Sequence, residues 1–201
     1  MDNQPRVRDI VIGSNLAPLV ECIYQYTNHT IVSAFIERRQ LETNTFHLPF
    51  EEMSITLYDV ATILKIPITG RSVSVPHHLI SSEASDLLCR LLGISLDVAA
   101  QQIRENRGPY VKLDWLKKTF MHLLNSVSNE KIEHIIRAYL LFLLGCTIFV
   151  DKSGTLVSVA YLILLDDLSM IDNYSHIYID SLALRADGTS GVLLDILPYL
   201  R

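Results

Sequence analysis

The sequence predicts a mainly α-helical domain of the α+β class that carries one small β-hairpin near residues 43–57. Apolar side chains recur at helical spacing along most of the 201 residues. Residues 43–48 are instead rich in β-branched and aromatic side chains, and residues 53–57 alternate between apolar and polar ones, with a turn over residues 49–52. Hydrophobic residues make up 49% of the chain and charged ones only 19%, so the domain can bury a sizeable core.

The N-terminal part of the chain is expected to hold a flexible lead-in and two helices. Residues 1–10 form the lead-in, and residues 11–201 form a single domain. Asn15 is a suitable N-cap for a helix over residues 16–26, whose apolar side chains recur at helical spacing. A second helix over residues 30–39 ends in a run of charged side chains.

A short helix is predicted directly after the hairpin. Thr56 stands three residues before Asp59, which is a variant of the capping box that marks the start of a helix. Pro67 ends this helix because the residue before a proline is pushed out of the α region. Residues 68–78 contain Gly, Pro and alternating Val, and they predict a loop with a short extended piece.

The rest of the chain predicts further helices separated by short connections. The expected helices are residues 82–92, 95–104, 115–125, 130–149 and 157–168. Ser82, Asp114 and Asn129 are the expected N-caps, and Gly93 is the expected stop of the first helix. Residues 110–113 are expected to be extended, residues 151–154 to form a tight turn, and residues 174–201 to hold two short helices.

Charge and cysteine content limit the class of protein. A net charge of -5 argues against a protein that coats nucleic acid by charge alone, although a local basic patch stays open. Cys22, Cys89 and Cys146 are widely spaced, which predicts buried free thiols in a reducing compartment. The most apolar run, residues 138–150, is shorter than the ~20 residues that span a bilayer. We therefore expect an intracellular protein without a membrane segment or signal peptide.

Four aspartates raise the possibility of a metal-dependent nuclease. Asp166 and Asp167, together with Asp172 and Asp180, could supply carboxylates to Mg²⁺. Adjacent residues on a helix point about 100° apart, so Asp166 and Asp167 do not converge by themselves. A polar helix end is the favoured interpretation.

Other candidate catalytic groups are weaker. His77 and His78 lack a third ligand at metal spacing. Lys152 lies in an expected exposed turn, which does not supply the desolvation that a Schiff-base lysine needs. Nucleophile and phosphate-binding motifs such as GxSxG, GxGxxG and GxxxxGK[ST] are missing from the sequence. We therefore expect no catalytic residue, no metal and no cofactor.

A DNA-binding element is an alternative interpretation of residues 55–67. Their sequence, ITLYDVATILKIP, resembles the first helix and turn of a helix-turn-helix. The recognition helix should begin after Pro67, but the β-branched residues, Gly70 and Pro76 that follow are poor helix formers. Arg71 is the one cation there that could contact a base.

Three blocks of sequence stand out when they are taken together. Residues 34–73 read AFIERRQLETNTFHLPFEEMSITLYDVATILKIPITGRSV, residues 91–120 read LLGISLDVAAQQIRENRGPYVKLDWLKKTF, and residues 137–175 read RAYLLFLLGCTIFVDKSGTLVSVAYLILLDDLSMIDNYS. In combination they resemble the plant mobile domain, which is found in the MAINTENANCE OF MERISTEMS family and in plant transposable elements. The blocks stand in the order that the family has. Arg39 replaces the family's usual Trp, Glu51 its usual Gly, and residues 176–178 its Trp-Gly-Ser, so residues 176–201 are expected to be divergent or truncated.

The resemblance implies a nuclear protein that acts in transposon silencing, gene expression control, genome integrity and meristem maintenance. It also implies a protein partner, either a phosphatase-seven-like serine/threonine phosphatase or another plant mobile domain protein. The family carries an aminotransferase-like label as well. The sequence does not support that label, because pyridoxal phosphate enzymes need a larger chain and a buried lysine with a partner for the ring nitrogen.

Two surfaces are candidates for binding. The candidate partner surface consists of Phe46, His47, Phe50, Glu52, Asp151 and Lys152. For the alternative, a transposon-derived nucleic-acid-binding module, the candidate contacts are Arg38, Arg39, Arg71, Lys112, Lys117 and Lys118, gathered on one face. An enzyme is the third hypothesis, and it would require a pocket with perturbed ionisable groups.

Overall fold

The computed structural model describes most of the chain between residues 5 and 175. The described residues are 5–22, 29–40, 42–43, 45–54, 56–67, 69–72, 75–76, 79–121, 131–149, 154–171 and 174–175. The helices are α1 (Pro5–Gly13), η1 (Ala17–Cys22), α2 (His29–Glu37), α3 (Leu57–Leu64), α4 (Ser81–Leu92), α5 (Leu96–Glu105), α6 (Leu113–Phe120), α7 (Ile132–Thr147) and η3 (Val159–Leu165), where η marks a 3₁₀-helix. The strands are β1 (Arg39–Gln40), β2 (Thr45–His47), β3 (Glu52–Met53), β4 (Arg71–Ser72), β5 (Tyr110–Lys112), β6 (Leu156–Ser158) and β7 (Tyr174–Ser175).

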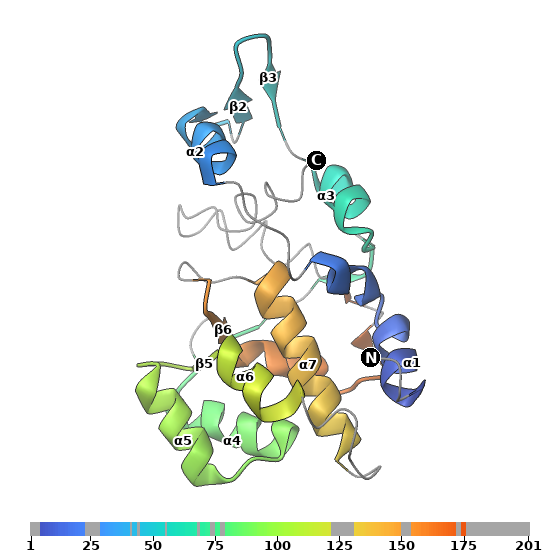
Figure 1. Ribbon diagram of the computed structural model, residues 1–201, viewed down its shortest axis with the longest axis vertical. Coiled ribbons are helices and arrows are strands. Elements are labelled where there is room, and N and C mark those ends of the chain that lie inside the picture. The colour runs from blue at the N-terminus through green and yellow to red at the C-terminus, as the bar shows by residue number, and fades with distance from the viewer. Residues whose placement is uncertain are drawn as a thin grey trace.

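The strands form three small sheets. Strands β1, β2 and β3 make an antiparallel sheet in which Phe46 pairs with both Arg39 and Met53. Strands β5 and β6 are antiparallel and place Val111 opposite Val157. Strands β4 and β7 are parallel. In Figure 1, α2 and the β2–β3 hairpin project at one end of the molecule, while α4 and α5 lie at the other.

Helix α7 is the centre of the hydrophobic core. It is buried along most of its length and contacts α1, α4, α6, η3 and β6. Gly145 brings the β5–β6 ladder directly onto this helix, because a Cβ at that position would lie 2.7 Å from the Cβ of Val157. In the described part of the chain, no helix is both long and apolar enough to cross a membrane.

Several local predictions are confirmed. The fold is mainly helical with a small hairpin, as expected. Thr56 and Asp59 form the predicted capping box: the backbone N–H of Thr56 donates to the Asp59 carboxylate, and the backbone N–H of Asp59 donates to the Thr56 hydroxyl. Gly93 ends α4 with a φ of +67° and donates its N–H to the carbonyl of Cys89. Residues 110–112 form a strand, as the sequence predicts.

Other local predictions are wrong, and tertiary contacts explain most of the differences. The expected lead-in is helical from Pro5 onward, because α1 packs against α7 and buries Val11. Residues 156–158 are a strand instead of the start of a helix, because they pair with β5. Ile80 occupies the N-cap position of α4 in place of Ser82, and Lys112 occupies that of α6 in place of Asp114.

Candidate functional site

The end of the molecule formed by α2 and strands β1 to β3, here called the projecting unit, has its own small core. The rings of Phe35 and Phe46 meet edge to face, with their centroids 5.5 Å apart. Phe46 is only 2% exposed, yet it does not belong to the main core cluster around α7. The backbone N–H of His47 donates to the carbonyl of Arg38 (2.8 Å), which joins β2 to the end of α2. These contacts hold the unit together locally.

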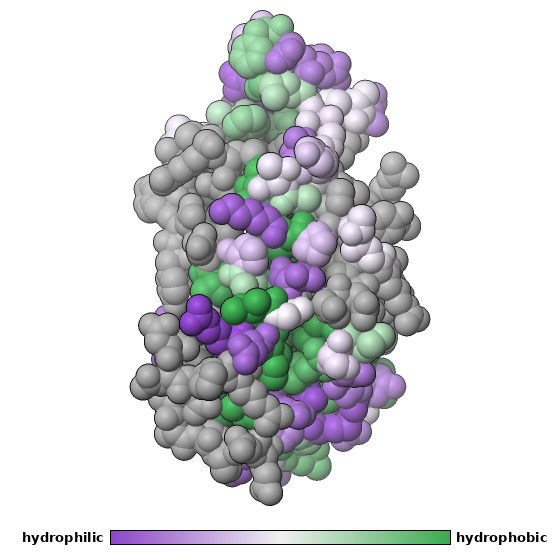
Figure 2. Space-filling model, turned by 90° about the vertical axis from the view of Figure 1, so that its right-hand side faces the viewer, coloured by the Kyte–Doolittle hydropathy of each residue, from purple (hydrophilic) through white to green (hydrophobic). Residues whose placement is uncertain are grey.

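Large apolar side chains are exposed on and beside this unit. Phe50 is 74% exposed in the turn between β2 and β3, and the N–H of Leu48 closes that turn by donating to the carbonyl of Glu51 (3.0 Å). Ile36 on α2 and Met53 on β3 are also exposed. Figure 2 shows hydrophobic and hydrophilic side chains next to each other at this end. Exposed apolar groups rimmed by polar ones are typical of a protein-binding surface.

Polar side chains on the hairpin are held by cross-strand contacts. The hydroxyl of Thr45 donates to the carboxylate of Glu52, whose Oε1 also lies 3.6 Å from Nε2 of His47. His47 and Glu52 are direct partners in the β2–β3 register. The hydroxyls of Thr43 and Thr45 share a further hydrogen bond of 2.6 Å. The hairpin therefore presents a preordered polar edge beside Phe50.

The candidate partner surface is thus partly assembled. His47, Phe50 and Glu52 are exposed together on the hairpin. The expectation for Phe46 as a contact residue is wrong, because its burial against Phe35 makes it the support of the hairpin. Asp151 and Lys152, the remaining members, lie outside the described residues.

The candidate nucleic-acid contacts are distributed over separate parts of the fold. Arg38 and Arg39 lie in the projecting unit, where burial lowers the pKa of Arg39 from its ordinary value. Lys112, Lys117 and Lys118 lie on β5 and α6 in the helical body (Figure 1). Lys118 is also engaged by Asp114 at 2.6 Å. The structure does not bring these two groups together on one face.

The described residues after Pro67 include a short strand where the helix-turn-helix interpretation requires a recognition helix. Arg71 lies in β4, which pairs with β7, and among the described residues between Pro67 and Ser81 none is helical. A recognition helix needs several consecutive turns of helix to enter a major groove. Helix α3 is therefore followed by the strand β4 and not by a recognition helix, and this contradicts the helix-turn-helix interpretation.

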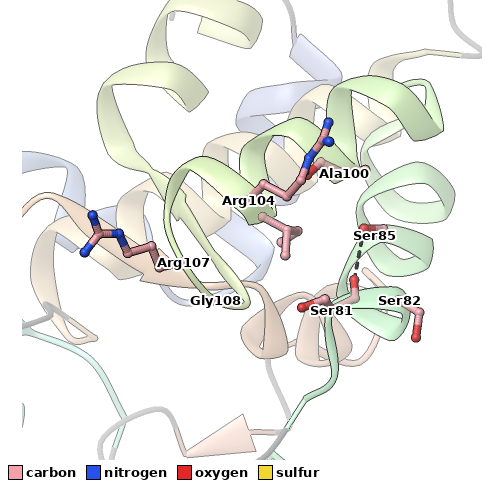
Figure 3. A pocket seen from close by; sticks show the side chains of 8 residues that line it. Ser81, Ser82, Ser85, Ala100, Arg104, Arg107 and Gly108 are labelled. Carbon is pink, nitrogen blue, oxygen red and sulfur yellow. Dashed lines mark hydrogen bonds between the residues drawn. The ribbon is translucent and has the colours of Figure 1, made fainter.

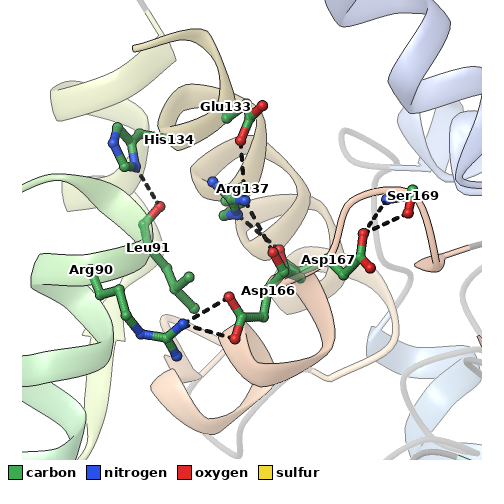
Figure 4. A network of polar contacts seen from close by, with 9 residues as sticks. Arg90, Leu91, Glu133, His134, Arg137, Asp166, Asp167 and Ser169 are labelled. Atoms are coloured by element: carbon green, nitrogen blue, oxygen red, sulfur yellow. Dashed lines mark hydrogen bonds and ion pairs between the residues drawn. The ribbon is translucent and has the colours of Figure 1, made fainter. Parts of the chain in front are cut away.

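The two adjacent aspartates serve the fold. Asp166 accepts two hydrogen bonds from Nη1 of Arg90 (2.9 and 2.8 Å), while Asp167 accepts from the backbone and hydroxyl of Ser169 (Figure 4). The hydrogen bond from the Ser169 hydroxyl lowers the pKa of Asp167 below its ordinary value. The two carboxylates thus have separate partners. Three or more possible metal ligands do not cluster anywhere in the described part of the chain, and Asp172, Asp180, His77 and His78 fall outside it.

Arg137 is a structural residue that the sequence did not single out. Its side chain is 11% exposed, and its Nε and Nη2 donate to the carbonyls of Leu165 and Asp166 at 2.9 and 3.0 Å. Nη2 also donates to Glu133 (3.3 Å), as Figure 4 shows. Arg137 therefore ties α7 to the end of η3. The sequence signal that could have identified Arg137 is its position as a lone cation at the start of a long apolar run.

A shallow groove of about 420 Å³ lies between the first turns of α4 and the end of α5. It is called the basic groove below, and its lining residues are Ser81, Ser82, Ser85, Ala100, Ile103, Arg104, Arg107 and Gly108. Figure 3 shows that serines line one wall and that the two arginines extend away from each other. The lining contains neither a carboxylate nor an imidazole. It therefore offers cationic and apolar contacts but no general acid or base.

Comparison with known proteins identifies related chains. The plant mobile domain family model matches residues 16–176. The protein MAIN-LIKE 1 of Arabidopsis thaliana is 40% identical over 148 residues, which cover 74% of this chain and 28% of that protein. The Arabidopsis protein MAINTENANCE OF MERISTEMS is 36% identical over 148 residues, covering 74% of this chain and 30% of that protein. No solved structure matches the chain.

A further relative bears the name of an enzyme. The Arabidopsis serine/threonine-protein phosphatase 7 long form homolog is 28% identical over 171 residues, which cover 85% of this chain and 12% of that protein. The chain therefore spans less than a third of the length of each of these relatives.

Proposed function

Because the chain belongs to the plant mobile domain family, we propose that it is a non-catalytic protein-interaction module whose partner binds the projecting unit. The observation that carries the proposal is Phe50, an aromatic side chain that is 74% exposed on a unit with its own small core. Aromatic side chains, phenylalanine among them, are enriched in the cores of protein interfaces relative to the rest of the surface. The polar edge formed by His47 and Glu52 would supply orientation at the rim of such a contact.

The ionisable groups of the body support a non-catalytic role. Arg90, Arg137 and Asp166 form hydrogen bonds that join α4, α7 and the end of η3, and Asp167 accepts hydrogen bonds from Ser169 within one turn. Cys146 is a poor nucleophile, because burial raises the pKa of its thiol to about 11. These groups therefore act on the stability of the fold.

The proposed partner is a phosphatase-seven-like serine/threonine phosphatase, with another plant mobile domain protein as the alternative. The support is the relative named serine/threonine-protein phosphatase 7 long form homolog, which contains a region similar to this chain. Joining two binding partners in one chain raises their effective concentration. A partnership between separate chains would use the same contacts without the covalent link.

We further propose that the protein acts in the nucleus, in transposon silencing, gene expression control, genome integrity and meristem maintenance. This part rests on family membership and on the relative named MAINTENANCE OF MERISTEMS. Fusion of the chain to a fluorescent protein in plant cells tests the location, and a signal confined to the cytoplasm contradicts it.

Titration calorimetry with a purified phosphatase-seven-like protein tests the interaction. We expect the wild-type chain to bind and Phe50→Ala to weaken binding at least about tenfold, which corresponds to about 1.4 kcal/mol. Ile12→Ala is the matched control, because Ile12 is also apolar and 53% exposed but lies on α1. If Phe50→Ala binds as tightly as the wild type, the projecting unit is not the partner surface. If the wild-type chain does not bind at all, the phosphatase is not the partner.

A further inference from the structure

The floor of the basic groove is apolar and its rim is cationic. Ile103 and Ala100 supply the apolar lining from α5, and Arg104 and Arg107 supply two positive charges. Nε of Arg104 donates to the carbonyl of Ala100 (3.3 Å), and this hydrogen bond holds the Nε end of the guanidinium group against α5. Neither arginine forms an ion pair with a carboxylate among the described residues. Both guanidinium groups are therefore available to an incoming anion.

Two exposed side chains with apolar surface adjoin lining residues of the groove. Ile80, which precedes Ser81, is 60% exposed. The ring of Tyr110 lies against Gly108, because a Cβ at Gly108 would meet that ring at 3.2 Å. Arginine and tyrosine are enriched at the centres of protein interfaces, and apolar neighbours exclude water from their contacts. The groove therefore suits a partner segment in which an apolar or aromatic side chain is followed or preceded by acidic ones.

The tip of the β2–β3 hairpin has this pattern of side chains. Phe50 is largely exposed, and Glu51 and Glu52 follow it directly. Glu51 is exposed, and it closes the turn through its backbone carbonyl and not through its side chain. An aromatic ring on the apolar floor would bring the two carboxylates toward the two guanidinium groups. Carboxylate and guanidinium groups form the strongest charge-assisted hydrogen bonds in proteins.

The hairpin and the basic groove lie at opposite ends of the molecule (Figure 1), so the hairpin tip cannot reach the groove of its own chain. We propose that the basic groove receives the hairpin tip of a second copy of this chain, and that copies associate head to tail. Such a contact joins two different surfaces and leaves one free hairpin and one free groove at the ends, so it can extend beyond a dimer. The proposal rests on the proposed function in that it assigns a partner to the same hairpin.

The association is expected to be weak and dependent on salt. The contact is confined to one turn and one shallow groove, which is small in comparison with stable protein interfaces. Its charges are exposed, so increasing ionic strength screens the attraction between them. Binding of the hairpin to a phosphatase would occupy the same tip, so a saturating phosphatase is expected to compete with self-association.

Sedimentation velocity of the 201-residue chain over a concentration series at low salt tests the proposal. We expect the weight-average sedimentation coefficient to rise with protein concentration and to fall when salt is added. Glu51→Arg/Glu52→Arg and Arg104→Glu/Arg107→Glu should each raise the dissociation constant at least about tenfold. Arg8→Glu/Lys131→Glu reverses two exposed cations outside the groove and should leave association unchanged. A thermal melt of each variant confirms that it is folded.

Combining the variants separates a specific contact from general charge effects. An equimolar mixture of the hairpin variant and the groove variant contains one intact hairpin with one intact groove and one reversed hairpin with one reversed groove, so it should recover the dimers and larger assemblies that neither variant forms alone. A single chain that carries all four reversals should recover self-association, because the opposite charges face each other again.

Three results would overturn the proposal. The first is a wild-type chain that stays monomeric at every concentration, and the second is unchanged association in the groove variant. The third is a mixture that forms no dimers. Phosphatase binding by the groove variant then decides the proposed function separately, because this variant keeps the hairpin intact.

Discussion

Replacement of Gly145 by alanine tests the packing of the β5–β6 ladder on α7. An alanine Cβ would lie 2.7 Å from the Cβ of Val157, 2.8 Å from Cδ2 of Leu113 and 2.9 Å from Cγ2 of Val157. Carbon atoms in good contact are about 3.5–4.0 Å apart, so the new methyl group must displace both neighbours. Val157 is fully buried and lies in a paired strand, which leaves little room for movement.

Two opposing terms set the magnitude. Overpacking a tight core costs about 1–3 kcal/mol, and three contacts below 3 Å place Gly145→Ala near the upper end. Alanine is about 1 kcal/mol better than glycine in a helix, which offsets part of that cost. We therefore expect a net loss of about 2 kcal/mol in the free energy of unfolding. For a protein of this size, the corresponding decrease in melting temperature is about 4–8 °C.

Urea denaturation followed by circular dichroism measures the change. Gly13→Ala is the matched control, because Gly13 is exposed at the end of α1 and nothing lies within 4 Å of the point that an alanine Cβ would occupy there. This control is expected to be neutral or slightly stabilising. A Gly145→Ala protein as stable as the wild type, or more stable, would refute the close approach of the ladder to α7.

Three other substitutions test the remaining local contacts. Thr56→Ala removes one side of the capping box and should lower the free energy of unfolding, measured by urea denaturation, by about 1 kcal/mol. The Thr56 hydroxyl lowers the pKa of Asp59 in the folded state, so the wild type should lose more stability than the variant as pH falls through that lowered pKa. Equal pH dependence of the two proteins would contradict this. Arg137→Met leaves the carbonyls of Leu165 and Asp166 without their charged donor and should lower the free energy of unfolding by about 3 kcal/mol. Arg90→Met breaks an exposed ion pair and should lower it by less than about 1 kcal/mol. Equal decreases in the two variants would argue against the assigned role of Arg137. In a Cys22→Ser/Cys89→Ser chain, the raised pKa of Cys146 should keep the native thiol unreactive toward a thiol reagent at about pH 8 until urea unfolds the protein, and rapid labelling in native buffer would show that the thiol is accessible.

Features encoded by neighbouring residues could be predicted from the sequence. The capping box depends on Thr56 and Asp59, and the end of α4 depends on the left-handed conformation that glycine adopts easily at Gly93. The turn over residues 49–52, which contains the exposed Phe50, was likewise expected from its local sequence. Each of these signals lies within a few residues, where periodicity and capping rules apply.

Features created by contacts between distant segments could not be predicted in this way. The strand at Leu156–Ser158 forms because Val157 pairs with Val111, and nothing in the local sequence names that partner. The burial of Phe46 depends on Phe35 in the neighbouring helix. The basic groove forms because α4 packs on α5 and brings Ser81 near Arg107, so no local sequence motif predicts it. Sequence periodicity therefore identified the elements but not the surfaces that they build together.

Two residues near the hairpin, Glu51 and Arg39, depart from the pattern that the family resemblance implies. Glu51 stands where the family resemblance implies glycine, yet it is not among the described residues with a positive φ, so the turn does not require glycine here. The substitution instead adds a carboxylate directly after Phe50. Arg39 pairs with Phe46 in the sheet and is partly buried, and this burial lowers the pKa of its guanidinium from the ordinary value. The charge of Glu51 therefore lies beside the exposed Phe50, where a change of charge modifies the choice of partner more than the stability of the fold.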